Sequence, residues 1–191
     1  MILLFPTIIH EIPVKKFKSI KKELMDFVYE QRQRDPRGLV LSNIGGWQSE
    51  SIYHSFNNII KETISESITS YFKEVFTTSE YKILNLWMNI NKKGDLNVPH
   101  DHPLCDLSGV LWINTPKECG NIEFQSPQHF NCAREIGEYK EEFRKKTHCY
   151  PGYWIPPKEG TMLLFPASVV HRVHVCQSDE DRISAAFNLS L

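Results

Sequence analysis

The pattern of hydrophobic and polar positions predicts two amphipathic helices in the first half of the chain. In the segment VKKFKSIKKELMDFVYEQRQR, apolar residues recur at helical spacing between lysines. The turn-forming stretch DPRG at residues 35–38 ends this pattern. A second apolar stripe predicts another helix over about residues 56–76. We expect both helices to pack against a sheet. The first stripe contains Phe17, Ile20, Leu24, Phe27 and Val28, and the second contains Ile60, Ile64, Ile68, Phe72 and Phe76.

From residue 81 onward the period changes from that of a helix to that of a strand. In YKILNLWMNI, alternation places Ile83, Asn85, Trp87 and Asn89 on one face. Further short strand candidates are bounded by Gly, Pro, Asn or Asp, and the N-terminal MILLFPTIIHEIP also has the pattern of a strand. Several short strands without helices between them predict an antiparallel sandwich or barrel. The candidates are LSGVLWIN, GNIEFQ, GTMLLFP, VVHRVHV and RISAAFNLSL.

The chain has the length and organisation of one domain over residues 1–191, with no internal repeat and no low-complexity linker. Residues 1–80 would form mainly helical support, and residues 81–191 the β-rich core. A polar and aromatic insertion at about 125–158 interrupts this core. It has two interpretations: a lid over a functional site, with Tyr150, Tyr153 and Trp154 as candidate contacts, or a decorated hairpin with a short helix.

Composition and charge narrow the class of protein without naming a function. Apolar residues make up 41% of the chain, charged residues 24%, and the net charge is −1. Nucleic acid is therefore not indicated as a partner, since phosphate binding needs a basic face. No window is long enough to span a bilayer, so we expect no membrane association. Five scattered cysteines without a CxxC pair favour reduced thiols, and we expect a soluble, cytoplasmic protein.

The stretch NVPHDHP contains the first candidate metal ligands. His100 and His102 are two residues apart, so on a strand they would share one face and could hold one ion together. Pro99 and Pro103 bracket the pair and stiffen the backbone. On the same alternation, Asp101 would point to the other face.

A second group of candidates lies in the last two strand segments. His171 shares a predicted inward face with Val173 and Val175, whereas His174 would lie on the surface beside Arg172. Arg182 and Ser184 would share one face of the final strand. An inward arginine requires an anion, and its planar fork with a serine hydroxyl suits a carboxylate. A structural salt bridge from Arg182 to Asp179 or Glu180 is the competing interpretation.

With these residues in place, the sequence resembles the iron(II)- and 2-oxoglutarate-dependent oxygenases. More narrowly, it is similar to a bacterial and phage group that carries an HxHP…SGVxY segment. The resemblance covers most of the chain except residues 124–160, and the spacing from His171 to Arg182-x-Ser184 is its most specific part. The matching segments are SNIGGWQS, HDHPLCDLSGVLWI, GTMLLFPASVVHRV and RISAAFN.

The resemblance implies an α+β protein with an all-β core: a double-stranded β-helix, or cupin-like jelly roll, with helices on one side. It implies that His171 is the distal iron ligand and that Arg182 and Ser184 bind the C5 carboxylate of 2-oxoglutarate. The family at large has an acid where this chain has His102. Three ligand sets follow: His100, His102 and His171 together; two histidines completed by water; or Asp101 after a local twist.

The function that the resemblance implies is a 2-oxoglutarate-dependent non-haem iron dioxygenase. It would use O2, with ascorbate as an accessory reductant, hydroxylate a substrate that the sequence does not identify, and release succinate and CO2. No catalytic residue beyond the metal ligands is predicted. The alternatives are a three-histidine metal dioxygenase that does not use 2-oxoglutarate, and a non-catalytic jelly-roll binding module. The oligomeric state stays open, with a homodimer as one option.

Overall fold

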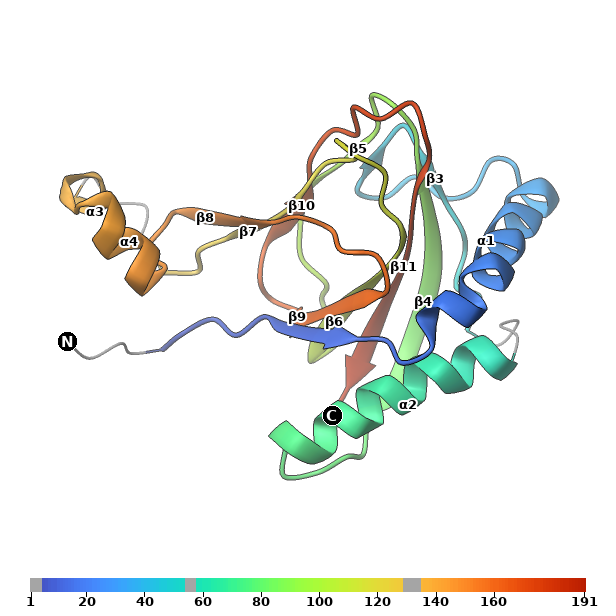
Figure 1. Ribbon diagram of the computed structural model, residues 1–191, viewed down its shortest axis with the longest axis horizontal. Helices are drawn as coiled ribbons and strands as arrows, with labels where there is room; N and C mark the ends of the chain where they lie inside the picture. Colours follow the sequence, from blue (N-terminus) through green and yellow to red (C-terminus); the bar gives the residue numbers. More distant parts are fainter. Residues whose placement is uncertain (1–4, 54–57, 129–134) are drawn as a thin grey trace.

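A computed structural model describes residues 5–53, 58–128 and 135–191 and contains two β-sheets with helices against one of them (Figure 1). The larger sheet has six strands in the order β1-β9-β6-β11-β4-β3, and each neighbouring pair is antiparallel. Its strands are β1 (His10–Pro13), β3 (Trp47–Gln48), β4 (Lys82–Asn91), β6 (Leu107–Asn114), β9 (Thr161–Pro166) and β11 (Arg182–Ser190).

The smaller sheet has five strands in the order β2-β5-β10-β7-β8, again with antiparallel pairing throughout. In both sheets, neighbouring strands are mostly distant in sequence, which is the wiring of a double-stranded β-helix rather than of a simple meander. The two sheets are not closed into a barrel. The predicted jelly-roll class with supporting helices is confirmed. The strands are β2 (Asn43–Ile44), β5 (Leu96–His100), β7 (Ile122–Gln125), β8 (Gly152–Ile155) and β10 (His171–Val173).

Helices α1 (Phe17–Arg34) and α2 (Asn58–Val75) pack against the six-stranded sheet, as their apolar stripes predict (Figure 1). Leu24 and Ile68 are fully buried in this contact. Burial of such a side chain contributes about 1.5–3 kcal/mol to the free energy of unfolding. The predicted start of the second helix at Phe56 lies outside the described residues.

The six-stranded sheet is buried on both faces. On β6, Leu111 and Ile113 point to the helices, whereas Val110 and Trp112 belong to a second apolar cluster between the sheets. This explains why seven consecutive residues of β6 are buried. The inner cluster therefore forms the floor on which a site between the sheets can be built.

One predicted face is wrong at the start of β4. Alternation groups Ile83 with Asn85, but Ile83 packs in the helix-facing core with Leu86. The pairing of β4 with β11 shifts register between Asn188 and Leu189, which leaves an extra residue on β4 at this point. Because such a bulge reverses the alternation, Ile83 turns outward from the space between the sheets.

A Gly-Gly turn joins the two sheets at one edge. Gly45 and Gly46 both have positive φ, 66° and 65°, and connect β2 in one sheet to β3 in the other. A Cβ on Gly45 would collide with a carboxylate oxygen of Asp95, and one on Gly46 would lie 2.8 Å from the amide nitrogen of Asn91. Both the backbone conformation and the space therefore require glycine here.

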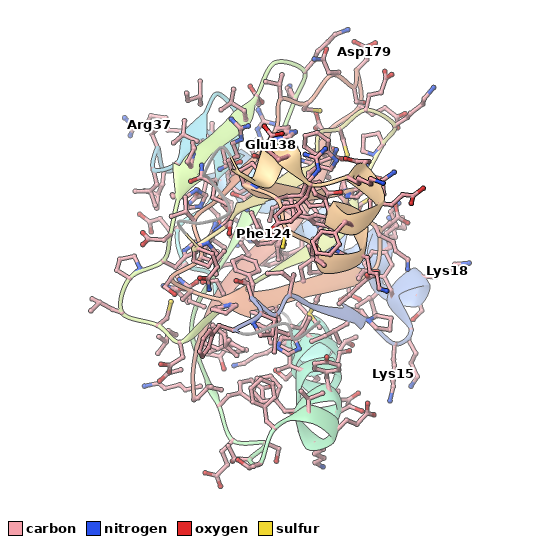
Figure 2. All side chains as sticks on the ribbon, turned by 90° about the vertical axis from the view of Figure 1, so that its left-hand side faces the viewer. Lys15, Lys18, Arg37, Phe124, Glu138 and Asp179 are labelled. Carbon is pink, nitrogen blue, oxygen red and sulfur yellow. The ribbon has the colours of Figure 1, made fainter. Side chains whose placement is uncertain are left out.

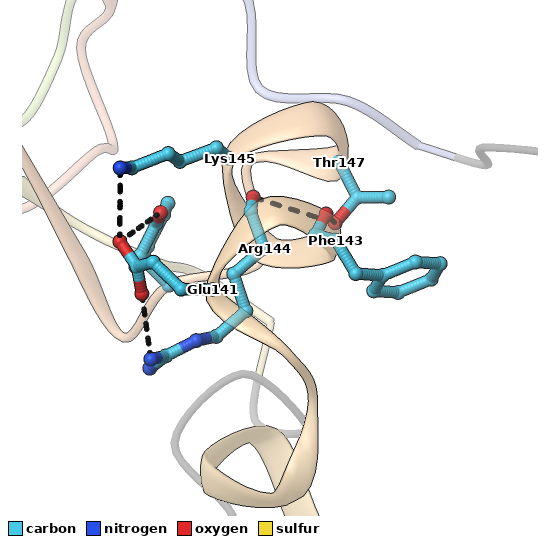
Figure 3. A network of polar contacts seen from close by, with 6 residues as sticks. Glu141, Phe143, Arg144, Lys145 and Thr147 are labelled. Atoms are coloured by element: carbon cyan, nitrogen blue, oxygen red, sulfur yellow. Dashed lines mark hydrogen bonds and ion pairs between the residues drawn. The ribbon is translucent and has the colours of Figure 1, made fainter.

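The insertion forms an arm that extends from the β7–β8 hairpin (Figure 1). It contains α3 (Glu135–Glu138) and α4 (Glu141–Thr147), so the decorated hairpin is the correct interpretation of its fold. Within α4, the Glu141 carboxylate pairs with Arg144 at 2.7 Å and with Lys145 at 3.7 Å, and Thr147 donates to the Phe143 carbonyl at 2.8 Å (Figure 3). Each such local pair contributes only about 0.2–0.5 kcal/mol.

Figure 2 views the molecule from the end of this arm, with Glu138 labelled on α3. Charged side chains such as Lys15, Lys18, Arg37 and Asp179 lie at the periphery of this view. Among the described helices, none is long and apolar enough to cross a membrane. The four described cysteines, at 105, 119, 149 and 176, are free thiols, and Cys132 lies outside the described residues.

Candidate metal and co-substrate site

A cavity of about 720 Å³ lies between the two sheets. Its lining includes three histidines, a buried arginine and a series of asparagines on neighbouring strands. The asparagines Asn85, Asn89 and Asn91 share the inner face of β4 with Trp87. The site is therefore built on paired strands rather than on loops alone, which favours a fixed geometry.

Three predicted histidines come together in this cavity. One ring nitrogen from each of His100, His102 and His171 lies within 4.8 Å of the others. His100 is the last residue of β5 and His171 the first of β10, and the two are direct partners across the strands. The ring centroids of His100 and His171 are 4.4 Å apart. Asp101 lines the cavity but does not belong to this cluster.

His102 reaches the cluster by a different route from the one that strand alternation suggests. Strand β5 ends at His100, so His102 lies in the loop that follows. Its backbone N–H donates to the carbonyl of Ala167 at 3.0 Å, which ties this loop to the turn before β10. Its ring lies 5.2 Å from that of His171 and 5.7 Å from that of Trp87.

Backbone carbonyls orient two of the three rings. Nδ1 of His100 donates to the Val98 carbonyl at 2.7 Å, and Nδ1 of His171 donates to the Val169 carbonyl at 3.0 Å. Each bond places the ring proton on Nδ1 and leaves Nε2 free as a ligand atom. Among the described residues, the ring nitrogens of His102 have no such partner. The rings of His100 and His171 are therefore fixed by hydrogen bonds, whereas that of His102 is not.

Burial keeps all three imidazoles neutral. It lowers the pKa of His171 to about 3, helped by the charges that His100 and His102 would carry. Burial likewise lowers the pKa of His102 to about 4 and lowers that of His100. Neutral imidazole is the form that binds metals, and Fe, Zn, Cu and Ni all accept it. Because a metal–imidazole bond is about 2 Å long, nitrogens within 4.8 Å of one another need only a small adjustment of the rings to hold one ion.

Arg182 is the most buried charged residue of the cavity, with 1% of its surface exposed. Its Nη1 donates to the carbonyls of Cys119 at 2.5 Å and His174 at 3.3 Å, whereas its buried Nη2 has no partner. No described acid pairs with it: Asp179, the predicted alternative, pairs with Lys93 at 2.8 Å. Burial lowers the pKa of Arg182. A buried cation with a free donor fits a carboxylate ligand.

Two further donors stand beside Arg182. Ser184 follows on the same face of β11, and Trp112 on β6 is its direct cross-strand partner. The indole Nε1 of Trp112 is buried and has no hydrogen-bond partner. We call Arg182, Ser184 and Trp112 the carboxylate end of the cavity. The sequence predicts the first two, but nothing in it reveals that the indole N–H of Trp112 is unpaired.

The neighbouring surface agrees with the sequence in part. His174 lies outside the histidine cluster and contacts Glu123 at 2.6 Å, and Arg172 pairs with the same carboxylate at 2.7 Å. The predicted inward position of Val175 is wrong, because β10 ends at Val173 and Val175 is 38% exposed. None of the described residues between 125 and 158 lines the cavity, so the described part of the arm does not form its wall.

The jelly-roll fold thus encloses one cavity in which three clustered histidines and a buried arginine with an unpaired donor occur together. The model of the family described as "Putative 2OG-Fe(II) oxygenase" matches residues 85–188, and the chain belongs to this family. It is thus a 2-oxoglutarate-dependent non-haem iron oxygenase, an oxidoreductase whose cofactors are iron(II) and 2-oxoglutarate. No curated protein matches the sequence significantly.

Solved structures of such enzymes share the fold. The epimerase SnoN from nogalamycin biosynthesis is 12% identical, with a TM-score of 0.70, and the alignment covers 96% of this chain and 78% of that one. HygX from Streptomyces hygroscopicus, with nickel and 2-oxoglutarate bound, is 10% identical with a TM-score of 0.67, covering 96% and 83%. The collagen prolyl hydroxylase of Paramecium Bursaria Chlorella virus-1 is 12% identical with a TM-score of 0.61, covering 96% of each chain. At these identities the likeness concerns the fold alone.

Proposed function

We propose that the protein hydroxylates its prime substrate with His100, His102 and His171 holding the iron and with Arg182 and Ser184 holding the C5 carboxylate of 2-oxoglutarate. The observation that carries this proposal is the unpaired Nη2 of buried Arg182 in the same cavity as the three histidines. A three-histidine dioxygenase without 2-oxoglutarate would have no use for this arginine.

In this proposal, the protein's residues position the metal and the ligands and exclude water, and they do not react themselves. Iron(II) and 2-oxoglutarate, when bound, supply the oxygen-dependent oxidation that ends in succinate and CO2. The carbonyls of Val98 and Val169 fix His100 and His171 so that Nε2 of each ring faces the metal position. The inner cluster around Phe124 and Phe165 shields His171 from bulk water.

At the far carboxylate, three donors of the chain would act together. Arg182 offers Nη2 and its positive charge, Ser184 a hydroxyl, and Trp112 the N–H of its indole ring. Charge-assisted hydrogen bonds of this kind are the stronger class. A carboxylate held by these donors would leave the other end of the diacid free to reach the histidines in the same cavity.

His102 takes the place where relatives carry an acid, and we propose that it is the weakest of the three ligands. His100 and His171 each have a carbonyl that fixes the ring, whereas His102 is held through its backbone and by ring contacts. An all-neutral ligand set also leaves more positive charge on the iron, which favours binding of the anionic co-substrate.

Release of succinate from 2-oxoglutarate tests the proposed reaction. The iron(II)-loaded protein is incubated with O2, ascorbate and pools of candidate substrates, and succinate and hydroxylated products are measured. We expect succinate above the no-protein background and a mass gain of one oxygen in a pool component, both lost in His171→Ala. Equal succinate from wild type and from His171→Ala would contradict the assignment.

Four wider features stay predictions within this proposal. The scattered free cysteines support a cytoplasmic location, since reduced thiols are typical of that compartment. The single domain over residues 1–191 rests on the length and the absence of a linker. The phage origin rests on the resemblance, and the homodimer is one option for an oligomeric state that stays open.

A further inference from the structure

A row of neutral polar side chains crosses the six-stranded sheet at the other end of the cavity. Asn188 on β11 is the direct partner of Asn85 on β4 and of Ser108 on β6. This row lies four residues along β11 from Ser184, so the two groups occupy different levels of one inner face. We call Asn85, Asn188 and Ser108 the amide end of the cavity.

The amide end has hydrogen-bonding capacity that the described residues leave unused. The Ser108 hydroxyl donates to Oδ1 of Asn188 at 2.7 Å, which orients that amide group. The NH2 group of Asn188 has no acceptor among the described residues. The buried Oδ1 of Asn85 has no donor. Side by side across two strands, the row therefore offers free N–H donors on both amide groups and a free acceptor on Asn85.

None of the three residues of the amide end is charged. Among the described residues that line the cavity, apart from the histidines, only Asp101 and Arg182 are charged, and neither belongs to the row. An ionic group bound to the row would find no opposite charge on these three side chains, which is unfavourable. A neutral group with a donor and an acceptor would satisfy both asparagines.

Trp87 connects the amide end to the metal position. It lies two residues from Asn85 on the same face of β4, and its ring lies 5.7 Å from that of His102. A group bound at Asn85 and Asn188 would therefore sit beside Trp87. Along β11 it would lie four residues from Ser184 of the carboxylate end.

We propose that the amide end binds the prime substrate through an uncharged group that carries both a hydrogen-bond donor and an acceptor, such as a carboxamide or a hydroxyl. This inference rests on the proposed function, because it assigns the substrate of that same site. It assigns Asn85 and Asn188 to substrate recognition, whereas the co-substrate is confined to the carboxylate end.

A matched set of small probes tests the charge preference. N-acetylglycinamide is neutral, glycinamide is its cationic counterpart and N-acetylglycine its anionic one, while myo-inositol represents hydroxyl groups. Binding to zinc-loaded protein with 2-oxoglutarate is measured by ligand-observed NMR, because zinc does not turn over. We expect one or both neutral probes to bind more tightly than either charged probe. Binding of N-acetylglycinamide would identify a carboxamide as the recognised group, and binding of myo-inositol would identify a hydroxyl.

Substitutions locate the probe. Asn85→Leu removes the free acceptor with little change in size and should weaken the neutral probe about tenfold. Asn85→Asp keeps the acceptor, adds a negative charge and should admit glycinamide. The control is Asn114→Leu: Asn114 lies on β6 outside the cavity and its NH2 donates to the Asp181 carbonyl, so its loss should leave probe binding unchanged. Thermal melting of each variant checks folding.

Three results would overturn the inference: tighter binding of a charged probe, unchanged binding of the neutral probes in both Asn85 variants, or no binding of either neutral probe. Titration of 2-oxoglutarate into the same samples reports separately on the proposed function. If the protein binds no 2-oxoglutarate but shows Asn85-dependent binding of a neutral probe, the proposed function is refuted and the assignment of the amide end is kept.

Discussion

The carboxylate end and the amide end of one cavity leave buried polar groups unpaired in chemically opposite ways. At the first, the cation Arg182 keeps a free donor and has the unpaired indole N–H of Trp112 close by in the sheet. At the second, neutral Asn85 keeps a free acceptor beside the free donor of Asn188. We therefore propose that the two ends sort ligands by charge, so that a diacid would bind at one end and a neutral group at the other.

The histidines lie at the level between these ends, and their replacement should give the largest effect. We expect His171→Ala to weaken binding of iron(II) or of zinc by more than about a hundredfold, because its ring is both buried and fixed by Val169. His102→Ala should weaken it by only about tenfold. Isothermal titration with zinc measures both. Equal losses of zinc affinity in the two variants would show that a ring fixed by a backbone carbonyl is no stronger a ligand than one without such a bond.

Replacing Arg182 by a neutral residue should abolish the charge difference between the carboxylate end and the amide end. Arg182→Met should weaken 2-oxoglutarate about a hundredfold, because a buried charge-assisted contact is lost. Binding of 2-oxopentanoate, which has the same chain length but no second carboxylate, should not change. The two affinities are measured in the zinc-loaded protein. If both ligands lose affinity equally, Arg182 shapes the fold and does not read the carboxylate.

Trp112→Phe sharpens the same comparison by removing one N–H and keeping the ring. We expect about a tenfold weaker affinity for 2-oxoglutarate and an unchanged affinity for 2-oxopentanoate. Trp47→Phe is the matched control, since the Trp47 indole already donates to the Asp35 carbonyl at 2.7 Å and does not line the cavity. It should reduce stability without changing either affinity. If Trp112→Phe instead reduces stability without changing either affinity, Trp112 serves core packing alone.

The smallest effect is expected outside the cavity, behind the carboxylate end. Burial works to raise the pKa of Glu123, but bonds from His174 and Arg172 outweigh it, and the pKa is lowered overall. A lowered pKa means stability that is present above the ordinary value of 4.5 and is lost as the pH falls below it.

Glu123→Gln should therefore destabilise the protein by about 1 kcal/mol at pH 7 and by less at pH 4. Denaturant unfolding at the two pH values measures the difference. Because the His174 carbonyl accepts from Arg182, affinity for 2-oxoglutarate should also fall, by less than about threefold. A destabilisation that is the same at both pH values would show that the carboxylate charge is not involved.

The sequence predicts those parts of the site that depend on one uninterrupted strand. Arg182 and Ser184 lie on β11, where alternation holds, and both line the cavity as expected. The two helices and most strands are likewise predictable from their periods. Alternation fails where a strand ends or bulges: His102 reaches the cluster from a loop after β5, and a bulge on β4 turns Ile83 toward the helix-facing core.

Contacts between distant strands escape the sequence altogether. The pairing of Asn85 with Asn188, and of Trp112 with Ser184, depends on the register of three strands in the sheet. Whether Trp112 Nε1 or Asn85 Oδ1 finds a partner depends in turn on every neighbour within reach. Only the packed structure shows that these groups are unpaired, and it is the unpaired groups that separate the two ends.

An anaerobic titration of the iron(II)-loaded protein with 2-oxoglutarate shows whether metal and co-substrate share one site, because the visible charge-transfer band requires both there. We expect a band in the wild type and no band in His171→Ala. In Arg182→Met the band should appear only at about hundredfold higher 2-oxoglutarate. A wild-type protein that binds iron(II) but gives no band, or a band of equal strength in His171→Ala, would contradict the shared site.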